Sequence, residues 1–485
     1  MRNEVIIYLN GEKQSVGSEH ASMMLAEYLR YKKNMTGTKI VCAEGDCGAC
    51  SVLRYFPLSS DQVHDKHFLP INSCIASIAQ MDGSSLITVE ALQTKDKLHP
   101  AQESMLNCHA SQCGFCTPGF VMALTGLVEE KIQNNETAIS TQEAKNALTG
   151  NLCRCTGYES IIKAATKTII EKSNSLYSRY FSKSQETELL NISKKALHLK
   201  NNEFEFFAPT VMSEALDFLK NNPDTKIIAS ATDLGVQKNK RKTKLPKLLS
   251  LHLVKDLYVI NLVKDTVHVG ARVTLSEFRH LMKDKVPELA TYLDIFASPQ
   301  IKNIATLIGN IANASPIGDT PPALLALEAN VEIASLAGNK SVPLSEFFLS
   351  YRKTKLAAGE IITGINFKTP SEFSILKLYK NSNRKDLDIS AINLALKVAW
   401  SDKSKKVISN VVLAVGGVAA TPLRFNKTEQ YLKQNTVSNA NIDQLLKVLH
   451  SEFKPVADVR ATAAYRHVLV ENYFIRALSE SGVLQ

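Results

Sequence analysis

The chain lacks several sequence signatures that would assign it to a common class of protein. No apolar run reaches the ~20 residues that a membrane-crossing helix needs. No G-x-G-x-x-G motif follows a first strand and no P-loop occurs, which disfavours a Rossmann dinucleotide fold and a P-loop nucleotidase. No G-x-S-x-G elbow is present, so a Ser-His-Asp hydrolase has no support. None of the 11 histidines forms a close metal-ligand pair such as H-E-x-x-H.

The N-terminus also lacks the features of a secretory signal. Residues 1–9 enter an apolar segment that contains Arg2 and Glu4, without a long apolar core or a small-residue cleavage site. We therefore expect a cytoplasmic protein that does not associate with membranes. With 485 residues, 45% hydrophobic and 21% charged, the chain is too long for a single core and predicts roughly three or four globular domains.

The net charge of +10 raises the question of nucleic-acid binding. The densest basic run covers residues 238–244 and has no aromatic residues between its lysines and Arg241. It thus lacks the stacking platform of single-strand binders, and we expect a solvated loop and no nucleic-acid partner. Attraction of an anionic cofactor or an acidic partner surface is a smaller alternative.

Eight of the nine cysteines fall into two groups of four in the first third of the chain. The first group has the spacing C-x4-C-x2-C and then a fourth cysteine after 23 residues; the second has C-x2-C, a 36-residue gap and C-x-C. The members are Cys42, Cys47, Cys50 and Cys74 in the first group, and Cys113, Cys116, Cys153 and Cys155 in the second. The first spacing is the plant-type pattern for a [2Fe–2S] cluster, which indicates electron transfer.

Other uses of these thiols remain open at the level of sequence. Disulfides are disfavoured in a reducing cytosol. Structural zinc is the natural alternative to iron and sulfide, and it is more plausible for the second group, whose spacing is less diagnostic. The ninth cysteine, Cys108, belongs to neither group and is predicted to be a free, at least half-buried thiol in a helix.

Residues 1–90 are predicted to form a β-rich module. A strand over 5–9, a turn at Asn10-Gly11 and a returning strand over 13–16 are followed by a helix over 22–31. Residues 42–50 predict a loop in which Gly45 and Gly48 let backbone amides approach the sulfurs of a buried anionic cluster. A last strand is expected over 85–89.

The hydrophobic period becomes helical over residues 91–173. Pro100 opens one predicted helix, and Thr117 is the expected N-cap of the next. Ser140 and Glu143 form a capping box, and Gly150 suits the stop of that helix. The cysteine pairs of the second group thus lie at the ends of helices, as in a four-helix arrangement that holds a cluster at one end. Residues 174–202 predict a linker with some helical character.

Mixed α and β patterns fill the rest of the chain. We expect a helix over 214–220 capped by Ser213, a strand over 226–230 and a hairpin within 257–270. A small-residue turn over 228–235 could leave N–H groups free for a pyrophosphate, although a plain structural turn is the commoner meaning of such a pattern. Residues 300–316, dense in small and hydrogen-bonding residues, favour a large polar ligand. A final module runs over 371–485.

Three cysteine-bearing segments resemble those of the molybdenum hydroxylase family. They are residues 44–50 (EGDCGAC), 112–119 (QCGFCTPG) and 150–158 (GNLCRCTGY), joined by the flavin motifs at Ala231-Thr232-Asp233 and Gly309-Asn310. The order of modules is similar to the small iron–sulfur/FAD subunit of the bacterial xanthine dehydrogenase branch. The resemblance covers nearly the whole chain.

The resemblance implies an α+β multidomain fold. Its parts would be a β-grasp plant-type ferredoxin domain over 1–90, a four-helix [2Fe–2S] domain over 91–173 and, after the linker over 174–202, an α+β FAD-binding domain over 203–370. A C-terminal α+β flavoprotein domain would follow over 371–485. The two cysteine groups would each hold a [2Fe–2S] cluster.

The resemblance also implies a set of FAD contacts. Residues 227–234 would wrap the pyrophosphate, Phe296 would pack on the flavin, and further side chains would line it. In full, the implied residues are Ile227, Ile228, Ala229, Ser230, Ala231, Thr232, Asp233, Leu234, Phe296, Thr306, Gly309, Asn310, Asn313, Asp319, Ile362 and Lys380.

The implied activity is electron transfer. Electrons from a molybdopterin centre on a large partner subunit would pass through both clusters to FAD and then to NAD+, with the second cysteine group nearer to molybdenum. No catalytic residue for the substrate would lie on this chain, and the pair would assemble as a dimer of heterodimers. A subunit of a different hydroxylase, for aldehydes, carbon monoxide or N-heterocycles, and a non-catalytic electron carrier are the alternatives.

Two positions depart from the family pattern. Ser230 stands where glycine is frequent, and Ile308 replaces the first glycine of a Gly-Gly-Asn motif. Serine is small enough to keep the turn. If the second position needs a positive φ, isoleucine would be strained there by about 1–3 kcal/mol and would weaken FAD retention.

Overall fold

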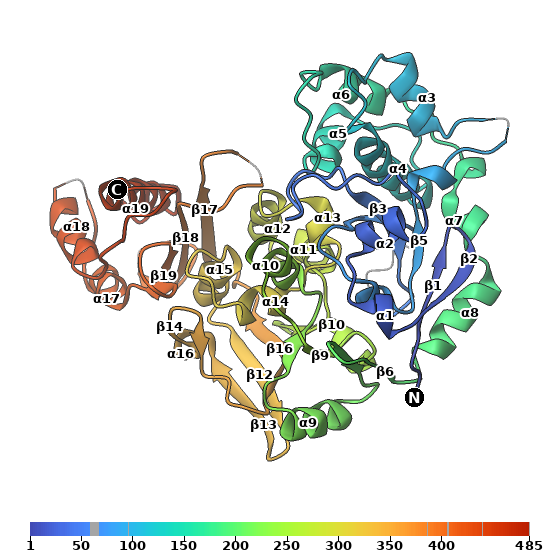
Figure 1. The fold of residues 1–485 in the computed structure, drawn as a ribbon. Coiled ribbons are helices and arrows are strands. Elements are labelled where there is room, and N and C mark those ends of the chain that lie inside the picture. The colour runs from blue at the N-terminus through green and yellow to red at the C-terminus, as the bar shows by residue number, and fades with distance from the viewer. Residues whose placement is uncertain (59–66, 96, 386, 405–406, 439, 485) are drawn as a thin grey trace. The chain divides into compact units, whose positions relative to one another are not determined.

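A computed structural model describes residues 1–485 except 59–66, 96, 386, 405–406, 439 and 485 (Figure 1). Its contacts divide the chain into two compact units. Unit one comprises residues 1–258, 274–276 and 297–306, and unit two comprises residues 259–273, 277–296 and 307–485. Each unit is described by itself.

Unit one begins with a five-stranded sheet in the order β2-β1-β5-β3-β4 (Figure 1). β1 pairs antiparallel with β2 through the predicted turn, where Asn10 and Gly11 both have positive φ, and parallel with β5. The predicted helix over 22–31 is shorter and begins at Leu25. The bounds are β1 Val5–Leu9, β2 Glu12–Val16, α1 Ser18–Ala21, α2 Leu25–Tyr31, β3 Ser51–Tyr55, β4 Leu69–Asn72, η1 Ile78–Met81, β5 Ser85–Ile87 and η2 Val89–Ala91.

Alternation along β1 gives this sheet two buried faces. Ile7 and its alternate neighbours pack with Leu25 and Leu29 of α2, whereas Tyr8 belongs to a second core that includes Leu53 and Phe120. Because successive strand side chains point to opposite faces, one strand contributes to both cores. The sheet therefore packs against α2 on one face and against the following helices on the other.

Four helices follow: α3 Pro100–Asn107, α4 Thr117–Gln133, α5 Thr141–Leu148 and α6 Glu159–Thr166. Pro100 opens α3, and Ser140 and Glu143 form the predicted capping box of α5. The expected N-cap at Thr117 is wrong by one position, because Thr117 is the first residue of α4 and its hydroxyl bonds that of Ser111 at 2.8 Å.

Gly150 also has a different role from the predicted one. Helix α5 ends at Leu148, and Gly150 does not have a positive φ, so no left-handed helix stop is needed there. A Cβ at this position would lie 2.0 Å from the Oε1 atom of Gln300. Glycine is required because another side chain occupies the space.

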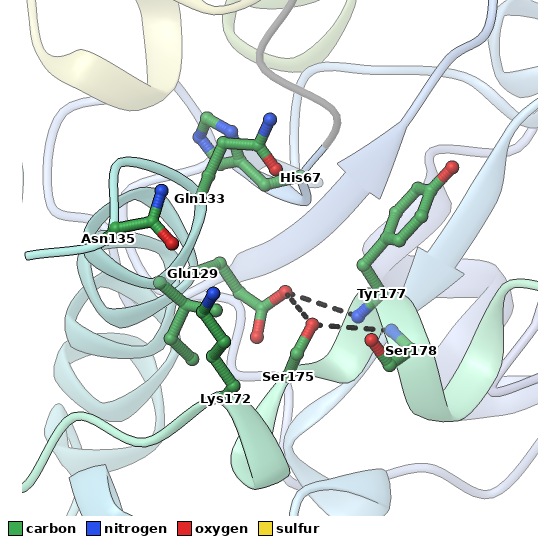
Figure 2. Close-up of a pocket in the computed structure, with 9 residues that line it drawn as sticks. His67, Glu129, Gln133, Asn135, Lys172, Ser175, Tyr177 and Ser178 are labelled. Atoms are coloured by element: carbon green, nitrogen blue, oxygen red, sulfur yellow. Dashed lines mark hydrogen bonds between the residues drawn. The ribbon is translucent and has the colours of Figure 1, made fainter.

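The segment predicted as a linker forms η3 Lys172–Asn174, α7 Leu176–Tyr180, α8 Lys183–Ile192 and β6 Leu197–Lys200. The buried carboxylate of Glu129 accepts a hydrogen bond from the amide of Leu176 at 2.7 Å. It accepts a second from the amide of Tyr177 at 3.1 Å (Figure 2). A polar pocket of about 270 Å³ lies beside this contact. Leu176 and Leu189 are fully buried, so this segment is packed onto the preceding domain.

The rest of unit one contains a second sheet, in the order β6-β7-β9-β8. Helix α9 begins at Met212 with Val211 as its N-cap, so the expected cap at Ser213 is wrong. The predicted strand over 226–230 is present but ends at Ile228. The bounds are β7 Glu205–Ala208, α9 Met212–Asn221, β8 Lys226–Ile228, α10 Thr232–Arg241, β9 Lys247–Ser250, η4 Lys255–Tyr258 and α13 Pro299–Lys302.

Unit two has one sheet in the order β10-β11-β16-β12-β13, a second in the order β17-β18-β19-β20, and the pair β14-β15. The predicted hairpin within 257–270 is β10-β11. Strands and helices are β10 Ile260–Val263, β11 Thr266–Gly270, α11 Leu275–Lys285, α12 Pro287–Asp294, α14 Leu307–Ala312, α15 Thr320–Ala326, β12 Asn330–Ser335, β13 Gly338–Pro343, α16 Leu344–Phe347, β14 Phe348–Ser350, β15 Lys353–Thr354, β16 Ile361–Lys368, β17 Ser374–Asn381, β18 Ile392–Trp400, β19 Ile408–Gly416, β20 Leu423–Arg424, α17 Asn426–Gln434, α18 Ile442–His450 and α19 Ala463–Glu480.

Helices pack on the β17–β20 sheet. α15 contacts β18 and β19, and α19 also packs on β18. Within the part of the chain that is described, no helix is both long and apolar enough to cross a membrane.

Candidate iron–sulfur and flavin sites

The first group of cysteines gathers in the loop between α2 and β3 and at the end of β4. Cys50 and Cys74 are buried, whereas Cys42 and Cys47 are half-buried. The thiol of Cys42 contacts those of Cys47 and Cys74, and Cys74 also contacts Cys50. Hydrogen bonds with Cys42 and Cys50, together with burial, raise the pKa of the Cys74 thiol.

The loop around the first group depends on left-handed backbone at several positions. Ala43, Gly45 and Gly48 have φ values of 54°, 78° and 67°. A Cβ on Gly48 would lie 2.4 Å from the carbonyl oxygen of Gly150, so only glycine fits. The side-chain amide of Asn72 donates a 2.7 Å hydrogen bond to the carbonyl of Gly45 and so supports the loop at that residue.

The second group of cysteines lies between the helices of the second domain. The Sγ atoms of Cys113 and Cys155 are 3.5 Å apart, and Cys116 contacts Cys153. Burial raises the pKa of Cys153, but hydrogen bonds from Thr156 and from backbone amides outweigh this and lower its pKa to about 7. The Thr156 hydroxyl donates to the Cys153 sulfur at 3.2 Å.

The two groups differ in exposure. Cys113 and Cys155 are exposed, and the side chains of Phe115, Leu152 and Tyr158 around them are 53%, 37% and 38% exposed. The first group has no comparable exposed thiol. The second group thus has two exposed thiols beside exposed apolar side chains, whereas the thiols of the first group are buried or half-buried.

The structure brings together the four thiols within each predicted set. Among the described residues, no group of three or more histidine, cysteine, aspartate or glutamate side chains has the arrangement needed to hold a metal ion. The thiol contacts within each set nevertheless distinguish these eight cysteines from Cys108, which is the C-cap residue of α3. The assignment of all eight as cluster ligands stays a prediction.

The chemistry of the donor set suits the iron–sulfur clusters that the spacing predicts. Soft thiolate donors suit iron and sulfide, and a cluster bound by four thiolates is anionic. The hydroxyl of Thr156, which donates to the Cys153 sulfur, supplies a hydrogen bond of the kind that supports such a ligand.

The loops of the two groups contact each other directly. The amide of Leu152, next to Cys153, donates to the carbonyl of Cys47 at 3.0 Å. The side-chain amide of Asn151 donates to the carbonyl of Gly48 at 3.1 Å. Asn151 is 2% exposed, so this contact is shielded from water.

The predicted pyrophosphate turn connects β8 to α10 in unit one. Ala231 has a φ of 54° and is the N-cap of α10, and Gln80 donates to the carbonyl of Ser230. The first amides of α10, like those of any α-helix, have no intrahelical acceptors. Residues 227–234 are mostly half-buried.

Helix α10 packs on the loop of the first cysteine group. A Cβ on Gly235 would lie 2.2 Å from the carbonyl oxygen of Ile75, which follows the ligand candidate Cys74. Asn239 donates to the carbonyls of Ala43 and Cys74 at 2.9 and 2.8 Å. The helix that starts at the predicted pyrophosphate turn therefore ends against the first cysteine loop.

Unit two brings together three of the predicted flavin residues. The ammonium of Lys380 lies 2.8 Å from the carboxylate of Asp319 and 5.8 Å from the ring centroid of Phe296. Both charged side chains are almost fully buried. The result is a buried ion pair beside an aromatic ring.

The other predicted flavin residues occupy separate elements. Asn310 lies on α14, where its Oδ1 accepts a hydrogen bond from the Thr320 hydroxyl at 2.6 Å. Gly309 lies on the same helix and is exposed, and Asn313 directly follows the helix and is half-buried. Ile362 is buried on β16, and Thr306 is buried in unit one.

Ile308 does not have the conformation that would strain it. It lies in the first turn of α14, is 4% exposed, and does not have a positive φ. The strain expected for a β-branched residue is therefore absent, and the argument for weakened FAD retention loses its basis. The side chain is instead part of the core of unit two.

Several contributors were not predicted. Ser390 and Asn393 both donate hydrogen bonds to Asp319, the latter at 3.0 Å, and Asn72 supports the first cysteine loop. Ser390 and Asn393 come from the strand region around β18, where nothing in the local sequence indicates a partner 71 or 74 residues away. Asn151 could have been suspected, since it adjoins the cysteines inside the 150–158 segment.

Three family models match the chain. A [2Fe–2S] binding domain matches residues 88–166, an FAD binding domain in molybdopterin dehydrogenase matches residues 202–369, and a CO dehydrogenase flavoprotein C-terminal domain matches residues 377–481. The protein is thus a multidomain α+β protein with [2Fe–2S] and FAD-binding domains. The exact domain boundaries predicted above remain predictions.

Curated relatives align over most of the chain. Xanthine dehydrogenase 1 of Arabidopsis thaliana is 30% identical over 93% of this chain, and aldehyde oxidase 1 of Bos taurus is 28% identical over 93%. The chain covers 37% of each of these two relatives.

Solved structures share the fold. A chain of carbon monoxide dehydrogenase from Hydrogenophaga pseudoflava has a TM-score of 0.54 and 24% identity, covering 58% of this chain and 98% of its own. A chain of quinoline 2-oxidoreductase from Pseudomonas putida 86 has a TM-score of 0.52 and 23% identity, with coverage of 58% and 98%. At 24% and 23% identity, these likenesses show a shared fold.

Proposed function

We propose that this chain is the electron-transfer subunit of a xanthine dehydrogenase. It passes electrons from a molybdopterin centre on a partner subunit through two [2Fe–2S] clusters to FAD and then to NAD+, while hypoxanthine and xanthine are oxidised to urate. The observation that carries the proposal lies within unit one. The loop of Cys42, Cys47 and Cys50 contacts the second cysteine group on one side and helix α10 on the other.

This double contact supports the order of the relay. A thiolate-bound cluster exchanges one electron at a time, and the first group, whose thiols are less exposed than those of the second, is suited to an internal position. The helix α10 that contacts it starts at the turn proposed to bind the FAD pyrophosphate. The first cluster is therefore the one that reduces the flavin.

The exposed second group supports a partner. Phe115, Leu152 and Tyr158 present apolar surface around Cys113 and Cys155. Aromatic and aliphatic side chains of this kind are enriched in the cores of protein–protein interfaces. A molybdopterin-binding subunit would cover this surface, and the pair would assemble as a dimer of heterodimers.

The flavin contacts of the proposal are those that the family motifs imply. Residues 227–234 would bind the pyrophosphate through backbone amides. Phe296, Asp319 and Lys380 would line the ring system, with Thr306, Gly309, Asn310, Asn313 and Ile362 as further contacts. The bound flavin supplies two-electron exchange with NAD+, and the chain's residues hold and orient it.

Two spectra and one assay test the proposal. The purified chain should show both flavin and iron–sulfur absorption. A chain that lacks one of these bands contradicts the proposal. The chain co-expressed with a molybdopterin-binding partner from the same source should form NADH when xanthine is added.

Another molybdenum hydroxylase is the second candidate. The similarity to aldehyde oxidase 1 and the fold shared with carbon monoxide dehydrogenase favour it specifically. Oxidation of aldehydes or N-heterocycles by the co-expressed pair, without oxidation of any purine, would select this candidate. Reduction of oxygen in place of NAD+ would change only the proposed electron acceptor and leave the rest of the proposal as it is.

A further inference from the structure

A glutamine from a distant segment fills the junction between the two cysteine loops. Gln300 belongs to α13, within the part of residues 297–306 that packs in unit one, and its side chain is 0% exposed. Its Nε2 donates to the Oδ1 of Asn151 at 2.7 Å and to the Oγ of Ser51 at 3.3 Å. Ser51 follows Cys50, and Asn151 precedes Leu152 and Cys153.

The glutamine completes a chain of hydrogen bonds across the junction. Asn151, which accepts from Gln300, donates to the carbonyl of Gly48. Ser51, the other acceptor, donates to the same carbonyl at 2.7 Å. One amide thus orients both side chains that converge on the loop of the first cysteine group.

The backbone around the junction is shaped to admit this side chain. A Cβ on Gly150 would lie 2.0 Å from the Oε1 of Gln300, and one on Gly48 would lie 2.5 Å from the amide nitrogen of Asn151. Helix α13 is fixed at its start by Ser298, whose hydroxyl accepts from the amide of Ile301 at 3.2 Å. Ile301 in turn packs with Cys50, Cys74 and Ile75.

We propose that Gln300 is a positioning residue for electron transfer between the two iron–sulfur clusters, because its amide locks the two cysteine loops against each other. The inference rests on the proposed function. The step is a one-electron transfer in which the second cluster is oxidised and the first is reduced, with no bond formed or broken and no proton moved. Gln300 touches neither cluster and acts through Asn151 and Ser51.

The test is the Gln300→Met variant of the full chain with its cofactors. Methionine has a similar volume but cannot donate the two hydrogen bonds. After reduction with dithionite, electron paramagnetic resonance of the wild type should show both clusters, with lines split by their mutual magnetic interaction. The variant should retain both signals at full spin count and lose the splitting, and transfer between the clusters should slow by about ten-fold.

A matched control separates this role from general stability. Gln185→Met removes two hydrogen bonds of another glutamine, the 3.0 Å bond to the carbonyl of Gly11 and the 2.8 Å bond from the amide of Ser182, both remote in sequence from the two cysteine groups. It should change neither the splitting nor the transfer rate. Unchanged splitting and rate in Gln300→Met would overturn the proposal, as would equal effects of the two variants.

A second variant keeps the proposal open to refutation if Gln300→Met does not fold. Gly150→Ala forces Gln300 away from its position without a forbidden φ, and it should reduce the splitting in the same direction. An intact splitting in folded Gly150→Ala overturns the proposal. Failure of the proposed function is a different result, since wild-type protein would then lack one of the two cluster signals or the flavin.

Discussion

The backbone amide of Leu152 donates a 3.0 Å hydrogen bond to the carbonyl oxygen of Cys47. Leu152 directly precedes Cys153 in the chain. The hydrogen bond therefore joins a predicted ligand of the first cluster to the residue before a predicted ligand of the second. This contact brings the two cysteine loops together although 105 positions separate the two residues (152 less 47).

Loss of one predicted ligand should remove one cluster and leave the other. Cys50→Ser should halve the iron and acid-labile sulfide of the purified chain, because serine is a poor ligand for a soft metal centre. Cys155→Ser should also halve them, with loss of the other paramagnetic signal. Cys108→Ser is the matched control and should keep all of the iron, since this thiol lies outside both groups. A full iron content in Cys50→Ser would remove Cys50 from the ligand set.

A side chain at Gly235 should separate α10 from the first cysteine loop. In Gly235→Ala the added Cβ would meet the carbonyl of Ile75 at 2.2 Å, so the helix or the loop must move. We expect a loss of stability of about 1–3 kcal/mol, typical of overpacking, together with reduced FAD content. Chemical denaturation and flavin absorbance measure the two effects. Lys240→Ala on the same helix removes only a 3.6 Å surface ion pair with Glu44 and should change stability by less than about 1 kcal/mol.

The buried pair of Arg2 and Asp82 should make unit one sensitive to acid. Burial raises the pKa of Asp82, but hydrogen bonds and charge from Arg2 and His252 outweigh it and lower the pKa. The folded protein thus binds this proton less tightly than the unfolded chain. The stability it contributes is present above the unfolded pKa of about 3.9 and is lost as pH falls through the lower folded value.

Asp82→Asn should therefore destabilise the protein by about 3 kcal/mol at neutral pH, because Arg2 loses its buried counter-charge. The difference from wild type should shrink below about pH 4, as followed by denaturation at several pH values. Glu346→Gln is the control, since it removes an exposed ion pair with Lys355 and should have little effect at any pH. A constant difference across the acid range would contradict the linkage.

Restoring glycine at position 308 should not improve flavin binding. Ile308 is buried in the first turn of α14, so Ile308→Gly removes a core side chain and weakens the helix. We expect a loss of about 3 kcal/mol from the cavity and a further loss of about 1 kcal/mol from glycine in a helix. Ile308→Val keeps most of the packing and should cost about 1 kcal/mol. A stable Gly variant with a higher flavin content would show that the family's glycine is needed here.

Local structure followed local sequence closely in several elements. The strand over Val5–Leu9, the Asn10-Gly11 turn and the capping box of Ser140 and Glu143 all depend on residues a few positions apart. Caps were less predictable. The side chains of Thr117 and Ser213 could each cap a helix, but the N-caps of α4 and α9 are Cys116 and Val211.

The candidate sites also contain both residues that the local sequence predicts and residues that it does not. The cysteine groups were visible because metal ligands must have particular donor atoms at particular spacings. Ser390 and Asn393 could not be found, because each reaches Asp319 only after β18 has folded beside α15. The strain expected at Ile308 failed because it assumed a backbone conformation that a short helix does not adopt.

The sequence by itself determined the chemistry of this protein: eight thiols in two spacings and the segments that resemble flavin motifs. Only the tertiary structure decided how that chemistry is connected. It put the amide of Leu152 on the carbonyl of Cys47, Asn239 on the first cysteine loop, and Gln300 in the junction between the two groups. The reason is physical: ligand type and spacing are properties of short segments, whereas close approach of distant segments depends on which glycines leave room and which buried amides find partners.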